Sequence, residues 1–267
     1  TIMVEVTDVP DPPDLVSGLV LNSHGKLELS HPENERQVID LNATDADGGE
    51  RRSDVLFASD NNLIGWFSNN SNKGNGSFDN TLNQISIETG RHYALATGDL
   101  DDDGDLDVVS VARATQMFKV HINHNQGEFN SAVAAGDAGV QDPVSVHLVD
   151  INADAKLDLL IGSYDDGMIV WIEGIGDGSF GSPKTIGEAS RVSSTWFADI
   201  DGDGDQDVLA ALASEDAVVW YENNGTASDW KMTVVSDEVD NPKSVHAGDM
   251  DGDGDVDVLS ASYNDDT

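Results

Sequence analysis

The chain has 267 residues, of which 51 are acidic and 13 basic, so its formal net charge is −38. Such a charge repels phosphate backbones and anionic lipid surfaces, which argues against nucleic acid and membranes as partners. No apolar stretch approaches the roughly 20 residues needed to cross a bilayer, and the absence of cysteine excludes disulfides and thiolate metal sites. Because this charge destabilises a compact state, we expect bound cations, saline surroundings or both.

The first fourteen residues, TIMVEVTDVPDPPD, differ from the rest of the chain. They have the character of a closing strand followed by a linker, because three prolines block regular strand pairing. We therefore expect residues 1–14 to be a linker or the end of a preceding module. Residues 15–267 are expected to form one domain.

A short aspartate-rich motif, which we call the acidic phrase, recurs along that domain at steps of 49 to 54 residues. Each copy is followed by an apolar strand, a polar turn and a strand that often carries Trp, as in LIGWFSNN, MIVWIEGI and AVVWYENN. A Gly-rich turn and two further short strands lead into the next copy. The copies occupy residues 45–54, 99–107, 150–158, 199–207 and 249–257.

Each unit contains four short runs of Val, Ile, Leu, Trp and Tyr, which predict a four-stranded antiparallel sheet. No helical period of convincing length is present. Five visible repeats of about 50 residues fit the blades of an all-β propeller, in which every blade buries its faces against its neighbours. A solenoid is the competing architecture, but its repeats are usually shorter.

The two ends of the sequence bear on closure of the ring. The last unit stops after two strands, whereas residues 17–33 resemble the missing second half, with HGKL where DGSF stands elsewhere. If both ends share one blade, the result is a five-bladed ring. The rival interpretation is a fragment of a six- to eight-bladed ring, and the sequence leaves both open.

The acidic phrase follows the pattern D-h-D-x-D-G-x-x-D, where h is apolar. Calcium prefers several carboxylate and carbonyl oxygens in an irregular shell, and the glycine at the sixth position permits the sharp turn that converges them. We expect side-chain oxygens from positions one, three, five and nine and a backbone carbonyl from position seven. The three strong Ca²⁺ sites are predicted at Asp99, Asp101, Asp103, Asp105 and Asp107, at Asp199, Asp201, Asp203, Asp205 and Asp207, and at Asp249, Asp251, Asp253, Asp255 and Asp257.

Two copies depart from this pattern. The copy at 150–158 has Asn152 at the third position and Ala155 in place of glycine, so we expect a weaker site. Its predicted ligands are Asp150, Asn152, Asp154, the carbonyl of Lys156, and Asp158. The copy at 45–54 keeps only Asp45, Asp47 and Asp54, and binding is not expected there. A solvated turn without metal is the alternative for any single copy, but repetition at one period favours metal loops.

The phrase, its period and the WYENN strand resemble the FG-GAP/VCBS-type repeats of bacterial exported proteins, akin to the calcium-bearing blades of integrin α-subunit propellers. The resemblance covers roughly residues 40–267. It implies a β-propeller with Ca²⁺ in the loops that join the first two strands of each blade. Separately, VEVTDVPDPP and HPENERQVIDLNATDADGG resemble the closing and opening of cadherin-like modules, which competes with a blade at residues 26–49.

Aromatic residues recur at fixed places in the units. Trp66, Trp171 and Trp220 share one position, where blade packing is the favoured interpretation and sugar stacking the alternative. A second set lies three residues before the acidic copies, on strands expected near the central axis, and comprises His147, Trp196 and His246. Packing between blades is again favoured there, with a ligand-binding ring as the alternative.

These observations favour a calcium-binding β-propeller that acts as an extracellular or cell-surface adhesion or ligand-binding module and not as an enzyme. A glycan or a cell-surface or matrix protein is the expected partner, and flanking domains or self-assembly are further options. One alternative is a propeller-fold polysaccharide lyase or hydrolase, for which Arg91, His92 and Tyr93 are only suggestive because neighbours on a strand point to opposite faces. The other alternative is a structural spacer or assembly unit of a large surface protein.

Overall fold

A computed structural model of the chain describes residues 20–21, 27–28, 37–38, 54–59, 62–68, 81–86, 92–124, 127–130 and 134–264. For residues 20–21, 27–28, 37–38 and 134–135 it describes the backbone alone. The predicted linker at 1–14, the cadherin-like segments and most of residues 17–33 and 45–54 lie outside this range.

The described residues form strands and turns and no helix, which confirms the all-β prediction. They accordingly contain no helical segment able to span a membrane. The strands are β1 (Val20–Leu21), β2 (Leu27–Glu28), β3 (Gln37–Val38), β4 (Val55–Ser59), β5 (Ile64–Phe67), β6 (Asn83–Ser86), β7 (His92–Gly98), β8 (Asp107–Ala112), β9 (Met117–His121), β10 (Ala134–Asp137), β11 (Pro143–Val149), β12 (Asp158–Ser163), β13 (Met168–Gly174), β14 (Phe180–Glu188), β15 (Val192–Ala198), β16 (Asp207–Leu212), β17 (Ala217–Glu222), β18 (Lys231–Ser236), β19 (Pro242–Gly248) and β20 (Asp257–Ser262).

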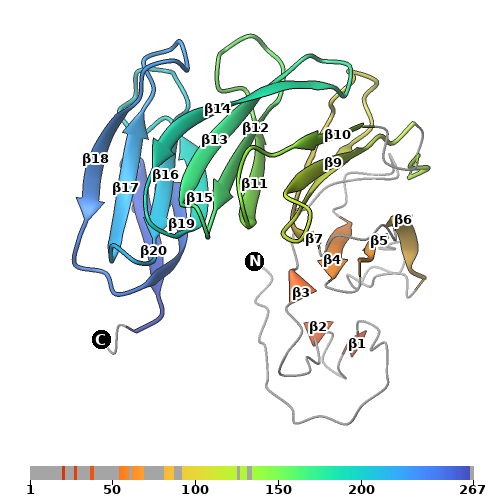
Figure 1. Cartoon of the computed structure of the whole chain (residues 1–267), viewed down its shortest axis with the longest axis horizontal. Coiled ribbons are helices and arrows are strands. Elements are labelled where there is room, and N and C mark those ends of the chain that lie inside the picture. Colours follow the sequence, from red (N-terminus) through yellow and green to blue (C-terminus); the bar gives the residue numbers. More distant parts are fainter. Residues whose placement is uncertain are drawn as a thin grey trace.

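Four of the sheets have four antiparallel strands each, in simple up-and-down order, as the sequence predicts (Figure 1). They are β3–β6, β7–β10, β11–β14 and β15–β18, and β19 pairs with β20 as the first half of a further unit. The sheets stand side by side in an arc, and the first strands β7, β11, β15 and β19 contact one another in turn. Each repeat of the sequence is therefore one sheet.

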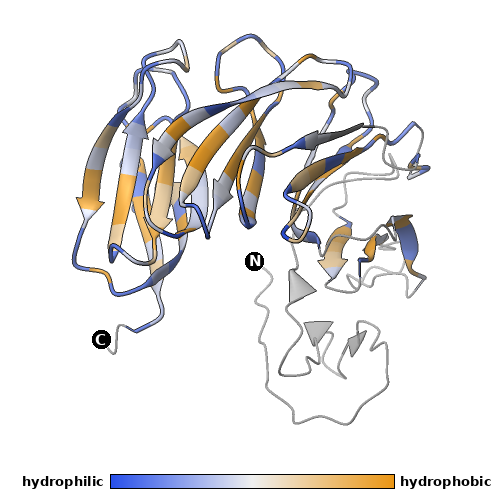
Figure 2. Ribbon diagram, viewed as in Figure 1, coloured by the Kyte–Doolittle hydropathy of each residue, from blue (hydrophilic) through white to orange (hydrophobic). Residues whose placement is uncertain are grey.

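The second strand of each complete sheet lies between two apolar cores. In β12, Leu159 and Ile161 face the core shared with β7–β10, whereas Leu160 faces the core shared with β15–β18. Successive side chains of a strand point to opposite faces, so both faces of β12 are buried. This explains why the second strands read as continuous apolar runs, which Figure 2 shows as hydrophobic strands between hydrophilic turns.

Hydrogen bonds join the first strands across the boundaries between sheets. Ser145 of β11 and Thr195 of β15 share a hydrogen bond of 2.8 Å between their hydroxyls. Ser193 donates its hydroxyl hydrogen to the carbonyl of Pro242 in β19 at 2.5 Å. The arrangement of one sheet against the next is therefore fixed by polar contacts as well as by apolar packing.

The C-terminal half sheet has an open edge. β20 has no third strand beside it among the described residues, and β1 pairs with β2 in a separate two-stranded sheet. Leu259 of β20 is 54% exposed, whereas Leu209, which holds the same position in β16, is 0% exposed. The described residues form no closed ring, so the five-bladed closure through residues 17–33 stays a prediction.

These two leucines, fifty residues apart in equivalent strands, form a matched pair for stability measurements. We expect Leu209→Ala to lower the free energy of unfolding by about 2–5 kcal/mol, because it opens a cavity in a closed core. Leu259→Ala should cost less than about 1 kcal/mol, because its side chain is mostly in solvent. Urea unfolding of both variants measures the difference. An equal cost would contradict the open edge and would favour a ring closed over β20.

Candidate metal centre

The acidic phrases lie where the sequence places them, between the first and second strands of a sheet. Residues 99–106 join β7 to β8, 150–157 join β11 to β12, 199–206 join β15 to β16, and 249–256 join β19 to β20. In each case the ninth residue of the phrase is the first residue of the second strand. The four loops therefore stand in equivalent places on four successive sheets.

Side chains of the loop organise its own backbone. The carboxylate of Asp99 accepts hydrogen bonds from the amides of Asp103 at 3.2 Å and Gly104 at 2.9 Å. Asp103 in turn accepts one from the amide of Asp105 at 2.9 Å. The bond from the sixth amide to the first aspartate and the bond from the seventh amide to the fifth aspartate recur in the other three loops. The first and fifth aspartates thus curl the chain so that the loop side chains converge.

All four loops share two backbone angles that favour glycine. The fourth and sixth residues have positive φ, with values of 59° at Asp102 and 91° at Gly104 in the first of them. The degenerate loop adopts the same shape although alanine stands at both places, with φ of 58° at Ala153 and 66° at Ala155. Losing the glycine therefore leaves the loop's path unchanged and adds conformational strain.

The ninth aspartate has a role that sequence reasoning missed. Asp107 accepts the amide of Leu100, at the start of its own loop, and the amide of Asn123, just beyond β9, each at 2.8 Å. Asp158 makes the same pair of bonds with Ile151 and Gly174, and Asp207 makes it with Ile200 and Asn223. We call this arrangement the aspartate clamp. It ties the acidic loop to the far end of the third strand.

The clamp aspartates are fully buried, with 0% exposure at Asp107, Asp158 and Asp207. Burial raises the pKa of Asp107 and of Asp158 to about 6, against the effect of their two backbone hydrogen bonds. Burial also raises the pKa of Asp207. Neighbouring loop carboxylates raise these pKa values further, so a cation in the loop would favour the charged form of the clamp.

The donor set fits a hard divalent cation at three of the loops. Carboxylate oxygens that lie within 4.8 Å of one another come from Asp99, Asp101 and Asp107, from Asp199, Asp201 and Asp203, and from Asp249, Asp251 and Asp257. An oxygen of Asp101 and one of Asp199 are buried and have no hydrogen-bond partner among the described residues. Burying a carboxylate oxygen without a partner is costly, and a bound cation would remove that cost.

Other predicted ligands stand apart from these clusters. Among the described residues, the loop at 150–158 contributes to no such group, in keeping with its Asn152 and Lys156. Of the copy at 45–54 the structure describes only Asp54, which is buried at the start of β4. His124 was not predicted, yet it lies beside Asp101 and Asp103. No pattern in the sequence points to it, because the second and third strands separate it from the loop.

The aromatic residues predicted to lie near the axis contact one another in the structure. The rings of Trp196 and His246 stack with centroids 3.9 Å apart, and His147 meets the edge of Trp196 at 5.3 Å. His147 donates its Nε2 hydrogen to the carbonyl of Thr195 at 2.7 Å, and burial lowers its pKa to about 4. Burial therefore favours the neutral form of His147, and the stacked rings pack the first strands together. Trp66 and Trp171 are buried between sheets, as the packing interpretation predicts.

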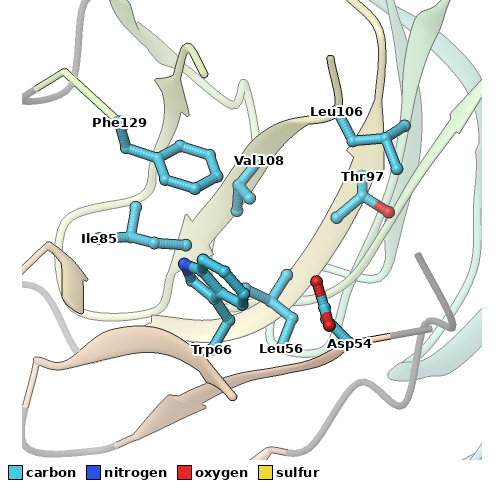
Figure 3. Close-up of a pocket in the computed structure, with 8 residues that line it drawn as sticks. All are labelled: Asp54, Leu56, Trp66, Ile85, Thr97, Leu106, Val108 and Phe129. Carbon is cyan, nitrogen blue, oxygen red and sulfur yellow. The ribbon is translucent and has the colours of Figure 1, made fainter. Parts of the chain in front are cut away.

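Two enclosed spaces differ greatly in size. A cavity of about 10 Å³ lies between the first two sheets, with Asp54 and Thr97 on one side and Trp66 among apolar groups on the other (Figure 3). It has room for one water molecule at most. A hollow of about 480 Å³ lies between the loops at 150–158 and 199–207, with Phe197 and Gln206 among its walls. Only the larger space has the size of a ligand pocket.

The strained alanines provide a test of the loop geometry. We expect Ala155→Gly to raise the free energy of unfolding by about 1 kcal/mol, because glycine adopts positive φ without a steric penalty. The matched change Gly204→Ala in the loop at 199–207 should cost about as much, since a Cβ there meets no atom within 4 Å and only the backbone angle matters. Urea unfolding in the presence of EDTA measures both. A destabilising Ala155→Gly would contradict the positive φ at this position.

Comparison with solved structures finds two proteins of low sequence identity, the first of which shares the fold of this chain. A lectin from Agrocybe aegerita, described as recognising non-reducing terminal N-acetylglucosamine, aligns with a TM-score of 0.59 and 18% identity over 85% of this chain and 60% of its own. The biofilm matrix protein Bap1 of V. cholerae aligns with a TM-score of 0.46 and 22% identity over 86% of this chain and 36% of its own. The chain thus spans well under two thirds of either protein.

No curated protein sequence matches the chain. The model of the FG-GAP-like repeat matches three times, at residues 99–161, 150–210 and 199–260. Each match begins at the first aspartate of one loop and ends in the second strand of the following sheet. Because these matches cover more than half of the sequence, the chain belongs to the FG-GAP-like repeat family.

Proposed function

We propose that this chain is a calcium-binding β-propeller module of an exported or cell-surface protein. The observation that carries the proposal is the convergence of carboxylate oxygens in three equivalent loops, two of which hold a buried oxygen without a partner. Calcium takes six to eight oxygen ligands in flexible geometry, which suits such loops. Side-by-side sheets whose first strands contact one another support the propeller architecture.

Calcium would act here as a structural ion. The loops at 99–107, 199–207 and 249–257 carry five or six carboxylates each, and the mutual repulsion of these charges opposes the compact loop. A divalent cation offsets about two of those charges and fixes the loop between the first two strands. The clamp would then connect the ordered loop to the end of the third strand. In the first loop the connection is made by the hydrogen bonds from the amides of Leu100 and Asn123.

Calcium titration of the melting temperature tests this proposal. At a concentration of about a hundred times its dissociation constant, one site adds about 2.7 kcal/mol to stability, so we expect the Tm to rise by at least about 5 °C. EDTA should reverse the rise. Asp201→Asn, which reproduces the chain's own Asn152, should reduce it, whereas the same change at the exposed Asp229 should not. An unchanged Tm at millimolar calcium would defeat the metal function.

A glycan is the ligand class we propose for the module. The hollow between the loops at 150–158 and 199–207 combines an aromatic wall at Phe197 with polar groups at Asp150 and Gln206. Sugars are commonly held between an aromatic face and a few polar side chains, and the size of the hollow suits a small saccharide. The likeness to a lectin shows the fold alone and motivates only the choice of the first probe.

Binding of N-acetylglucosamine-terminated oligosaccharides, measured by calorimetry with and without calcium, tests the glycan proposal. Gln206→Ala should weaken binding by about tenfold, because it removes a hydrogen-bonding side chain from the wall while its backbone carbonyl still accepts from Asn223. Lys243→Ala, outside the hollow, is the matched control. Failure of every glycan to bind would contradict this ligand class, and release of cleaved sugar would favour the alternative of a lyase or hydrolase.

A further inference from the structure

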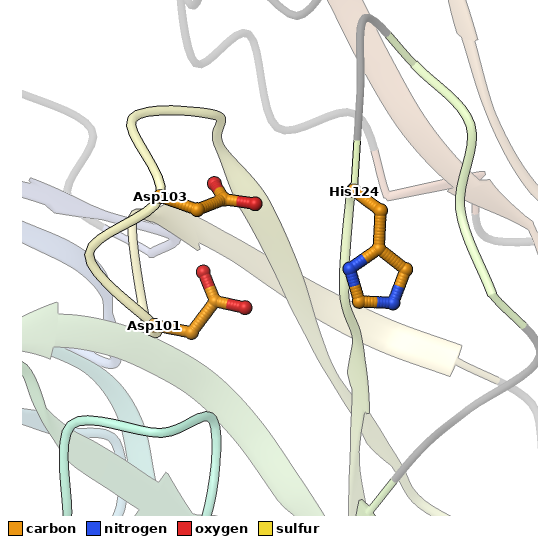
Figure 4. A group of neighbouring side chains, drawn as sticks. All are labelled: Asp101, Asp103 and His124. Atoms are coloured by element: carbon orange, nitrogen blue, oxygen red, sulfur yellow. The ribbon is translucent and has the colours of Figure 1, made fainter.

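One metal loop differs from the others in having a histidine beside it. Oxygen atoms of Asp101 and Asp103 and a ring nitrogen of His124 lie within 4.8 Å of one another (Figure 4). The aspartates come from the loop between β7 and β8, whereas His124 follows β9. Two elements that are separate in sequence therefore present a mixed set of oxygen and nitrogen ligands.

The backbone of the histidine is held against the loop by the aspartate clamp. The residue before it, Asn123, donates its amide hydrogen to Asp107 at 2.8 Å and a side-chain hydrogen to the carbonyl of Leu106 at 3.2 Å. His124 donates its own amide hydrogen to the carbonyl of Glu128 at 3.2 Å, which closes the turn. The backbone of His124 is therefore held beside the loop, and its exposed side chain lies near Asp101 and Asp103.

An unsatisfied carboxylate oxygen points to a ligand at this place. One side-chain oxygen of Asp101 is buried and has no hydrogen-bond partner among the described residues. A buried oxygen of an acidic group gains from a nearby cation, because the cation offsets its lost hydration. The donor atoms of one tetrahedral zinc ion lie about 3.4 Å apart. The three atoms here lie within 4.8 Å of one another, so small side-chain shifts would bring them to one ion.

The repeats themselves show that the fold does not require this histidine. In the next two sheets Gly174 and Asn223 bond to the clamp aspartate as Asn123 does, so Ile175 and Asn224 stand where His124 stands. Ile175 is 47% exposed and offers no ligand. The side-chain oxygen of Asn224 accepts hydrogen bonds from the amide and hydroxyl of Thr226. The histidine therefore changes the chemistry of one loop without a structural need.

We propose that Asp101, Asp103 and His124 bind a divalent transition-metal ion, with zinc as the probe, so that this loop differs in metal preference from its equivalents. Calcium takes oxygen ligands almost without exception, whereas imidazole together with carboxylate suits zinc and its neighbours in the first transition row. The proposal rests on the proposed metal binding of the loops. It adds a site whose selectivity comes from a residue outside the acidic phrase.

Calorimetric titration of the whole chain with zinc, in the presence of millimolar calcium, tests the site. We expect one zinc ion to bind at this site and His124→Asn, which copies Asn224, to weaken that binding by about tenfold or more. The reciprocal change Asn224→His should add one zinc ion per chain, since it places an imidazole beside the loop at 199–207. Zinc affinity that is the same in His124→Asn as in the unchanged chain would overturn the proposal, as would the absence of zinc binding.

The calcium-dependent rise of the Tm, read on the same samples, separates this proposal from the calcium function. The rise in Tm of His124→Asn should differ from that of the unchanged chain by no more than about 1 °C, because the loop retains all its carboxylates. A normal rise together with unaltered zinc affinity would overturn the zinc site alone. An absent rise together with zinc binding that depends on His124 would defeat the calcium function and support the zinc site.

Discussion

The rest of the structure depends on a buried carboxylate at the start of the second strand in the sheets β7–β10, β11–β14 and β15–β18. Asp107, Asp158 and Asp207 are enclosed, and each accepts hydrogen bonds from one amide of its loop and from one amide at or just beyond the end of the third strand. Burial of this kind is expensive for the charged form and strengthens the bonds that it makes. The loop, the second strand and the third strand therefore meet at one point, which the cation-binding residues surround.

The clamp also explains how one sheet can pack against the next. With the loop fixed, the second strand is free to place apolar side chains on both faces, as Leu159 and Leu160 do in β12. The first strands then make contact through small polar groups such as Ser145 and Thr195. Because every sheet uses the same contacts on both faces, the array extends by repetition. The exposed Leu259 marks where that repetition stops among the described residues.

Much of this could be predicted from the sequence because it depends on spacing along the chain. The repeat period predicts the four-stranded sheets, and the alternate carboxylates predict the loops between the first two strands of each sheet. The clamp could not be predicted, because the amide that Asp107 binds at Asn123 is sixteen residues away and carries no side-chain signature. The proximity of His124 to Asp101 arises in the same way, from a folded hairpin. The positive φ at Ala155 could not be predicted, because alanine in place of glycine indicates only a weaker site and not the path of the backbone.

In these repeats, the residue that maintains the fold and the residue that can change ligand preference are neighbours in the sequence. Asn123 and Asn223 carry the same side chain and Gly174 carries none, yet all three make the same backbone bond to the clamp. That bond therefore requires their amides and not their side chains. The residues that follow them, His124, Ile175 and Asn224, are less constrained still, although each stands beside an acidic loop. A change at that place alters what the loop can bind without disturbing the bonds that hold it. Differences in ligand preference can therefore accumulate from sheet to sheet while the array remains intact.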